Sequence, residues 1–214
     1  VVILIILSAI FAPLLAPMDP YQSSMLNRLK PIGYKDFILG TDELGRDILS
    51  RILYGGRISL TMGILPVFIA TVIGGLLGII AGFVGGRTNM TIMRIMDVFY
   101  AFPSILLAVA ISGALGGGIF NGMMSLTLVF IPPLCRVAET ATSQVRNLDF
   151  VEAARATGAS TFSIIRVHIL GNVLGPILIY SSSLVSVSIL IASGLSFLGL
   201  GVTPPEPDWG LMLN

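Results

Sequence analysis

The stretch NLDFVEAARATGASTFSIIRVHIL, from Asn147 to Leu170, is a polar, alanine-rich segment between two long apolar runs. Those runs, 98–135 and 169–205, contain no Asp, Glu, Lys or Arg, and two further runs of this kind occupy 1–18 and 58–86. Each is long enough to cross, or nearly cross, the ~30 Å hydrocarbon core of a bilayer. The alternation predicts several membrane-spanning segments with one amphipathic segment inserted among them.

The overall composition supports this interpretation. Hydrophobic residues make up 55% of the 214 residues and charged residues 11%, with a mean hydropathy of +0.96. A soluble domain of this size carries roughly 25% charged residues. The alternating polar and apolar pattern of a membrane barrel is missing, which leaves helices as the spanning structure. We therefore predict an all-α fold, a polytopic transmembrane helical bundle.

The apolar runs predict five spans, at about 1–16, 58–84, 90–114, 119–139 and 169–193. Pro13 and Pro17 would end the first, which we interpret as a partial span. We expect three parts: the partial span at 1–17, an extracytoplasmic loop with an interfacial helix at 18–57, and a core at 58–214. Within the core, 140–168 is the predicted cytoplasmic segment and 197–214 an extracytoplasmic tail.

The orientation follows from the positions of Lys and Arg, which concentrate on the cytoplasmic side of membrane proteins. Two loops on one side, around Arg87 and Arg94 and from Arg136 to Arg166, hold six of the twelve basic residues. The 115–121 turn and the tail on the other side hold none. We therefore place the Asn147–Leu170 segment in the cytoplasm. Basic residues are balanced locally by acidic ones, so no nucleic-acid partner is expected.

The cytoplasmic segment has the pattern of two short helices that meet at a glycine. Asp149 and Glu152 have the spacing of a capping box, Gly158 suits a left-handed helix end, and Ser160 can cap a second helix that continues into the fifth span. Small side chains keep the first helix slim enough to enter a groove on a partner: Ala153, Ala154 and Ala156. By these features alone, a solvated loop helix fits equally well.

The same residues resemble a known family signature. EAARATG (Glu152–Gly158) followed by HIL (168–170) is similar to the EAA motif of permease subunits of binding-protein-dependent ABC importers. In that family the loop docks on a cytoplasmic ATPase subunit. The resemblance therefore implies ATPase-coupling roles for a set of residues in this segment: Asp149, Glu152, Ala153, Ala154, Gly158 and Ser160. The family motif continues with Pro where this chain has Gly171, which implies a softer elbow.

Three other stretches resemble the dipeptide, oligopeptide and nickel branch of this family: LGTDELGRDILSRILYGGRISL (39–60), MRIMDVFYAFPSILLA (93–108) and LSFLGLGVTPPEPDWG (195–210). The resemblance implies the type I permease architecture of ABC importers in a bacterial or archaeal cytoplasmic membrane, and a chain truncated at both ends. It implies transport of peptides or nickel chelates. The implied partners are a second, different permease subunit, two ATPase subunits that bind the ATP, and an extracytoplasmic binding protein. No cofactor is implied for this chain itself.

Residues outside the EAA motif predict an interfacial helix and a helix-packing surface. TDELGRDILSRILY (41–54) has the pattern of an interfacial helix capped by Thr41 or Asp42. Its polar positions are candidates for a structural belt or for contact with the binding protein: Asp42, Arg46, Asp47 and Arg51. The four-residue spacing of Gly74, Gly78 and Gly82 predicts close packing against another helix.

Prolines within the predicted spans indicate kinks. Pro103 should bend the third span, and Pro132 and Pro133 the fourth; each bend serves packing or an opening pathway equally well. Arg94 and Asp97, three residues apart, can form an ion pair near the cytoplasmic surface.

The sequence offers little for catalysis. His168 is the sole histidine, without a cluster of metal ligands around it, and Cys135 lies in an apolar run. No nucleophile–base arrangement and no GxxxxGK[ST] motif occurs, so we expect neither enzyme activity nor a metal site. An ion-gradient-driven transporter or channel is the alternative. Such proteins place ionisable residues near the bilayer midplane, whereas the apolar runs here have none.

Overall fold

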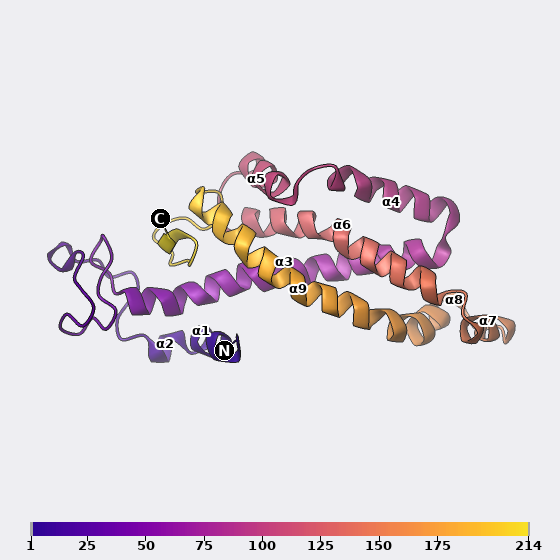
Figure 1. Ribbon diagram of the computed structural model, residues 1–214, viewed down its shortest axis with the longest axis horizontal. Coiled ribbons are helices and arrows are strands. Elements are labelled where there is room, and N and C mark those ends of the chain that lie inside the picture. The colour runs from indigo at the N-terminus through magenta and orange to yellow at the C-terminus, as the bar shows by residue number, and fades with distance from the viewer. Residues whose placement is uncertain (1, 214) are drawn as a thin grey trace. The chain divides into compact units, whose positions relative to one another are not determined.

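The computed structural model describes residues 2–213, which fold into helices joined mostly by short connections, with a long irregular segment between α2 and α3 (Figure 1). The strand-like content of this part of the chain is two isolated bridges, Tyr34–Phe37 and Thr41–Asp47, which confirms the all-α prediction. The helical elements are α1 (Val2–Ile10), α2 (Ala12–Leu15), η1 (Met25–Asn27), α3 (Ile48–Val84), α4 (Gly86–Tyr100), α5 (Ser104–Leu115), α6 (Ile119–Val145), α7 (Asp149–Ala156), α8 (Thr161–Ser163), η2 (Ile164–Ile169), α9 (Leu170–Phe197) and η3 (Leu211–Leu213).

Three helices in the described residues are long and apolar enough to cross a membrane: α3, α6 and the continuous helix Thr161–Phe197. The pair α4 and α5 would add a fourth span if it is taken as one, although its halves are bent by 86°. These correspond in position to four of the five spans expected from the sequence. The first apolar run instead forms α1 and α2, which have 9 and 4 residues.

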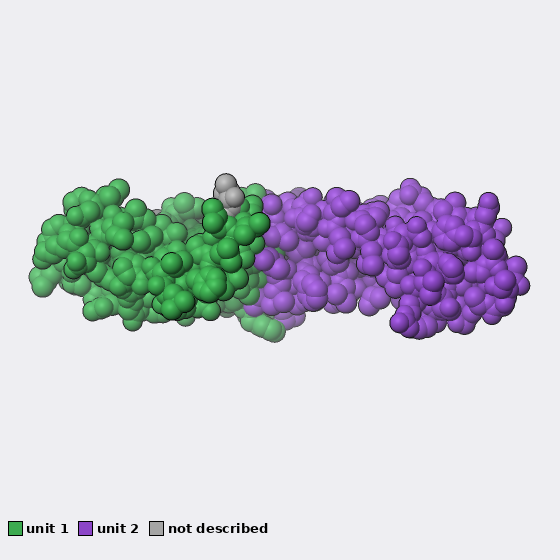
Figure 2. Space-filling view, turned by 90° about the horizontal axis from the view of Figure 1, so that it is seen from below, with its two compact units in different colours: residues 1–63, 112–122, 189–214 green, residues 64–111, 123–188 purple. Residues whose placement is uncertain are grey.

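The chain divides into two compact units, coloured separately in Figure 2. Unit 1 comprises residues 1–63, 112–122 and 189–214, and unit 2 comprises 64–111 and 123–188. Three of the long helices, α3, α6 and α9, contribute residues to both units. The sequence-based division followed membrane topology, whereas these units follow contacts within the chain.

In unit 2, α3 packs closely against α6 through its glycine stripe. A Cβ on Gly74 would lie 2.7 Å from the carbonyl oxygen of Ile131, and one on Gly82 would lie 2.7 Å from the Glu139 carbonyl oxygen. A Cβ on Gly78 would overlap the carbonyl of Cys135. The predicted packing role of this stripe is therefore confirmed, because any larger side chain would force the two backbones apart.

In unit 1, the polar loop is organised differently from the sequence prediction. Residues 41–47 form a turn in place of an interfacial helix, and α3 begins at Ile48. Asp47 is the residue that caps the helix, because its Oδ2 accepts hydrogen bonds from the Ser50 amide (2.8 Å) and hydroxyl (2.6 Å). The segment forms a turn in place of a helix because Asp42 Oδ1 accepts hydrogen bonds from the Leu44 and Arg46 amides of the same loop.

The prolines act in two ways. Around Pro103 the chain leaves the helix altogether, so the predicted kink is a break between α4 and α5. By contrast, α6 continues through Pro132 and Pro133. The predicted pairing of Asp97 with Arg94 is wrong, since the Asp97 carboxylate binds Arg136 of α6 instead.

Candidate functional site

The segment singled out in the sequence folds into an elbow, residues 149–169, made of α7, α8 and η2. α7 ends before Gly158, whose φ of +82° is the left-handed conformation predicted for it. Ser160 then caps α8, with its Oγ accepting a hydrogen bond from the Ser163 amide at 3.2 Å. The helix from Thr161 continues without interruption to Phe197. These features agree with the sequence prediction of two helices joined at a glycine.

The predicted capping box is wrong. Leu148 occupies the N-cap position of α7, and no side chain caps the helix there. Asp149 is the first helical residue, so it and Glu152 both lie in the first turn. Carboxylates there still interact favourably with the positive end of the helix dipole.

One buried side chain of α7 anchors this helix to the helical bundle. Val151 of α7 is 0% exposed and belongs to a hydrophobic cluster with residues of α3, α6, η2 and α9: Ile79, Ala138, Ala141, Ile164, Ile169, Val173 and Ile177. Ala154, one turn further along α7, packs against the same cluster. A helix this short is marginal on its own, so this burial is what holds α7 in place.

Two ring contacts add to the anchor. The Arg155 guanidinium lies over the Phe83 ring of α3, with 5.4 Å from Cζ to the ring centroid. The rings of Phe150 and His168 are 6.1 Å apart and tilted. His168 therefore packs against an aromatic ring, as expected for a structural histidine.

The opposite face of α7 is exposed. The exposed residues on this face or at its C-terminal end are Glu152, Ala153, Ala156 and Gly158, and the solvent-exposed Arg155 lies beside them over Phe83. Of the residues to which the resemblance gives coupling roles, Ala154 is half-buried, and Asp149 and Ser160 are exposed near the two ends of α7. The result is a slim, accessible surface on a helix that is fixed from behind.

The base of the long helix has an unusual backbone. Residues Ile164–Ile169 form a π-helical turn between α8 and α9, and the Leu170 amide bonds to the Ile165 carbonyl. Such turns often occur at functional sites and mark a local change in helix geometry. Here it lies where the anchored elbow joins the long helix. Gly171, the position where the family motif has Pro, follows directly and is exposed.

The packing contacts of the elbow were not predicted from the sequence. Val151 and Ala154 have the three-residue spacing of a buried helix face, a signal that was available in the sequence. The Arg155–Phe83 contact joins residues 72 positions apart, for which the sequence gives no signal.

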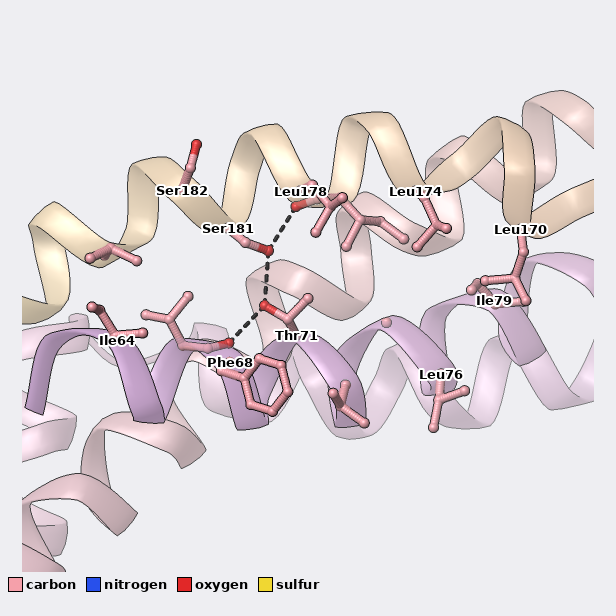
Figure 3. A pocket seen from close by; sticks show the side chains of 15 residues that line it. Ile64, Phe68, Thr71, Leu76, Ile79, Leu170, Leu174, Leu178, Ser181 and Ser182 are labelled. Atoms are coloured by element: carbon pink, nitrogen blue, oxygen red, sulfur yellow. Dashed lines mark hydrogen bonds between the residues drawn. The ribbon is translucent and has the colours of Figure 1, made fainter. Parts of the chain in front are cut away.

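A cavity of about 530 Å³ lies between α3 and α9 in unit 2. Its walls are mostly aliphatic, as Figure 3 shows, with Phe68 and Ser182 among the lining residues and Thr71 and Ser181 as a polar pair in the middle. Their hydroxyl oxygens are 2.8 Å apart, and each lies 2.7 Å from a carbonyl oxygen of its own helix, Val67 and Ile177 respectively, so one hydroxyl donates to the other while the second donates to its carbonyl. Since the two hydroxyls find hydrogen-bond partners within the protein, this open cavity, which we call the groove, can face an apolar environment.

The candidate contact residues of the first loop divide into buried and accessible ones. Asp47 and Arg51 are buried, and the Arg51 guanidinium donates to the carbonyls of Pro20 (3.2 Å) and Pro205 (3.4 Å). Asp42 and Arg46 are partly accessible and form an ion pair at 2.7 Å. Burial favours a structural role for Asp47 and Arg51, and leaves Asp42 and Arg46 as the candidates that a partner could reach.

Two groups of this loop have shifted pKa values. Burial raises the pKa of Asp42, but hydrogen bonds from the Arg46 amide and guanidinium and the Leu44 amide outweigh this, so its pKa falls below the ordinary value. Burial and the hydrogen bond to Glu206 raise the pKa of Tyr21 to about 12. The Tyr21 hydroxyl donates this bond at 2.7 Å. Tyr21 is therefore protonated at neutral pH.

No group of three or more His, Cys, Asp or Glu within residues 2–213 is arranged to hold a metal ion.

Comparison with known proteins decides the family. Residues 74–214 match the family described as the inner membrane component of binding-protein-dependent transport systems. The chain belongs to this family. Residues 1–31 additionally match the N-terminal transmembrane domain of oligopeptide transport permease C.

Relatives cover nearly the whole chain. A di/tripeptide transport permease of Pseudomonas aeruginosa is 43% identical over 99% of this chain and 71% of its own length. A probable D,D-dipeptide transport permease of Escherichia coli is 40% identical over 100% of this chain and 71% of its own length. A glutathione transport permease of Pectobacterium atrosepticum is 41% identical over 100% of this chain and 71% of its own length.

A solved structure supports the fold. An inward-facing MetNI methionine ABC transporter has a chain that matches with a TM-score of 0.60 and 20% identity, covering 74% of this chain and 85% of that one. The chain is therefore a transmembrane permease subunit of an ATP-driven importer, located in the inner membrane. Permeases of this family work with an ATPase and a solute-binding protein, and are not themselves the ATPase.

Proposed function

We propose that this permease carries short peptides across the cytoplasmic membrane and pairs with a second, different permease subunit. In this proposal α7 transmits the conformational change of the ATPase to the transmembrane helices. Peptide cargo is supported by the relatives, whose names specify di/tripeptides, D,D-dipeptides and glutathione. ATP would be bound by two partner ATPase subunits, and the binding protein would deliver the peptide from outside.

The observation that carries the coupling proposal is the two-sided nature of α7. Val151 is buried in the bundle, while Glu152 and Ala153 next to it are exposed. A partner that binds the exposed face can pull on α7, and the buried face transmits this motion to the helices it touches. The helix Thr161–Phe197 is continuous, so motion at its base would be carried along it.

The nucleotide can shift the transporter between states only if the ATPase grips α7 differently in each state. The exposed carboxylate Glu152 and the adjacent small residues would form the gripped surface. Reversing the charge at Glu152 should therefore weaken the grip without disturbing the bundle, since this side chain is outside the hydrophobic cluster.

The test is uptake of a labelled dipeptide by cells that carry Glu152→Lys in the complete importer. We expect uptake to fall at least about 100-fold and copurification of the ATPase to be lost, at normal membrane expression. Gly158→Pro should have the same effect, because a residue with φ near −65° does not fit a position at +82°.

Glu43→Lys is the matched control, since Glu43 is an exposed carboxylate in the other unit. It should leave uptake and ATPase copurification unchanged. Normal uptake by Glu152→Lys at normal expression would refute the coupling role of α7. Uptake that persists without ATP and follows an ion gradient would favour the secondary-transporter alternative.

A further inference from the structure

Two adjoining cavities lie on a different side of α9 from the groove of Figure 3. The first, of about 230 Å³, is lined by residues of the α4–α5 break, α5, α6 and α9. The second, of about 340 Å³, is lined by residues of α4, α6 and α9, among them Arg136, Thr140 and Gln144. They share three wall residues: Tyr100, Pro133 and Tyr180. The pair thus forms one continuous surface with tyrosines at its centre, which we call the tyrosine wall.

Arg136, a residue of the tyrosine wall, forms an ion pair with the neighbouring Asp97. Arg136 Nη2 is 2.6 Å from Asp97 Oδ1, and the guanidinium lies over the Tyr100 ring at 4.8 Å. The side chains of Arg136 and Asp97 are 46% and 47% exposed. Arg136 lies in α6, a candidate membrane span, and Asp97 lies in α4, one half of the bent pair of α4 and α5. Ionised groups facing hydrocarbon are costly, so this exposed pair contacts water, lipid headgroups or a polar partner in preference to lipid tails.

The two sides of α9 present different residues. The side toward the groove of Figure 3 presents aliphatic residues such as Leu174, Leu178 and Val185, together with two serines. The side toward the cavities presents Pro176, Leu184 and Val187, together with the phenol of Tyr180. Positions 178 and 180 are two residues apart, which places them on roughly opposite sides of an α-helix.

We infer that the tyrosine wall is a binding surface for the transported zwitterionic peptide, with Arg136 receiving its carboxylate and Asp97 its ammonium group. This rests on the proposed function. The Arg136–Asp97 pair is neutral, and so is a zwitterion. When the peptide enters, one ion pair is exchanged for two, so each charge keeps a partner and no net charge is buried. The tyrosine rings would contact the apolar parts of the peptide.

The first test is cysteine labelling in the complete importer, reconstituted in liposomes in a Cys135→Ala background. Tyr180→Cys is compared with Leu178→Cys, using a cationic, water-soluble methanethiosulfonate reagent and the dipeptide dialanine. We expect Tyr180→Cys to be labelled, and dialanine to slow the labelling at least about five-fold under turnover. Leu178→Cys should resist labelling. Equal labelling at both positions, or no protection by dialanine, would overturn the inference.

The second test separates peptide binding from simple anchoring of Arg136 at the membrane surface. Arg136→Gln should reduce the ratio of dialanine to dialaninamide uptake at least about ten-fold, because the amide lacks the carboxylate. Arg136→Lys should retain most of this ratio. An unchanged ratio in Arg136→Gln would indicate that Arg136 anchors the helix at the membrane surface. It would refute the inference about the tyrosine wall but leave the proposed function standing. Absence of dialanine uptake by the unaltered importer would refute the proposed function together with it.

Discussion

Different kinds of contact stabilise the interior of each of the two units of this permease. In unit 1, polar side chains bind the loops to α3: Asp208 Oδ1 accepts from the Ser59 hydroxyl at 2.6 Å, and Arg51 holds two loop carbonyls. In unit 2, α3 and α6 approach so closely at Gly78 that the backbone itself forms the contact. Hydrogen bonds position the irregular segments, and close packing positions the regular ones.

The difference follows from the surroundings of each region. Loops carry many backbone groups without helical partners, so buried carboxylates and guanidinium groups are needed to satisfy them. Helices in a membrane already satisfy their backbones and gain little from burying apolar side chains, because lipid tails are equally apolar. Their association therefore depends on van der Waals contact, for which small residues are required.

The largest effect should come from Gly78→Leu, which tests the close-packed region. Its Cβ would overlap the Cys135 carbonyl, so the two helices must separate at a cost of about 3 kcal/mol or more. We expect loss of the folded protein in a thermal unfolding assay in detergent. Gly75→Leu is the matched control, because a Cβ at Gly75 meets nothing within 4 Å. Equal unfolding temperatures for the two variants would contradict the proposed packing.

A smaller effect should come from Asp208→Ala, which tests the polar region. Asp208 is 2% exposed, and its carboxylate accepts from Ser59 and from the amides of Gly210 (3.0 Å) and Leu211 (3.3 Å). Removing it leaves buried donors unsatisfied, at a cost of about 2 kcal/mol in the free energy of unfolding. Denaturant unfolding should show this loss. The exposed Asp36→Ala should change little, and a similar loss there would argue against a specific role.

The smallest effect should come from acid, acting through Asp42. Its pKa is lowered in the folded state, so its ionised form stabilises the folded loop at neutral pH, and this contribution disappears as the pH falls through the folded pKa. The effect should stay below about 1 kcal/mol, because the carboxylate is partly exposed. Unfolding measured from pH 6 to pH 3 should show a shallower decline in Asp42→Asn than in the unaltered protein. Identical declines would show that Asp42 contributes nothing.

Much of the fold was predictable because lipid imposes a simple pattern. The charge-free runs located α3, α6 and the long helix ending at Phe197, and the glycine spacing identified the face of α3 that packs. The prediction failed at residues 41–47, where a helical pattern of apolar residues gave way to a turn. There the short-range hydrogen bonds of Asp42 outweigh helix propensity, and such competition is not visible in periodicity.

For the elbow, the predictions based on the conformational preference of a single residue were confirmed, whereas predictions of side-chain partners failed. Gly158 and Ser160 occupy the conformations that their residue types favour, so their roles were readable. The capping box was wrongly predicted, because Leu148 lies at the N-cap of α7 and no side chain caps the helix there. The ion-pair partner of Asp97 was also wrongly predicted. Arg94 is the nearest basic residue on the same helix, whereas Arg136 comes close to Asp97 only when α4 and α6 pack together.

By itself, the sequence determined that the chain lies in a membrane, which segments are helical, and where a slim helix interrupts them. These properties depend on hydropathy and on preferences of single residues, which act over a few positions. The tertiary structure decided that Val151 fixes α7 while Glu152 stays exposed, and that Tyr100, Arg136 and Tyr180 share one wall. Those outcomes depend on which helix faces meet, and that is set by packing between residues far apart in the chain.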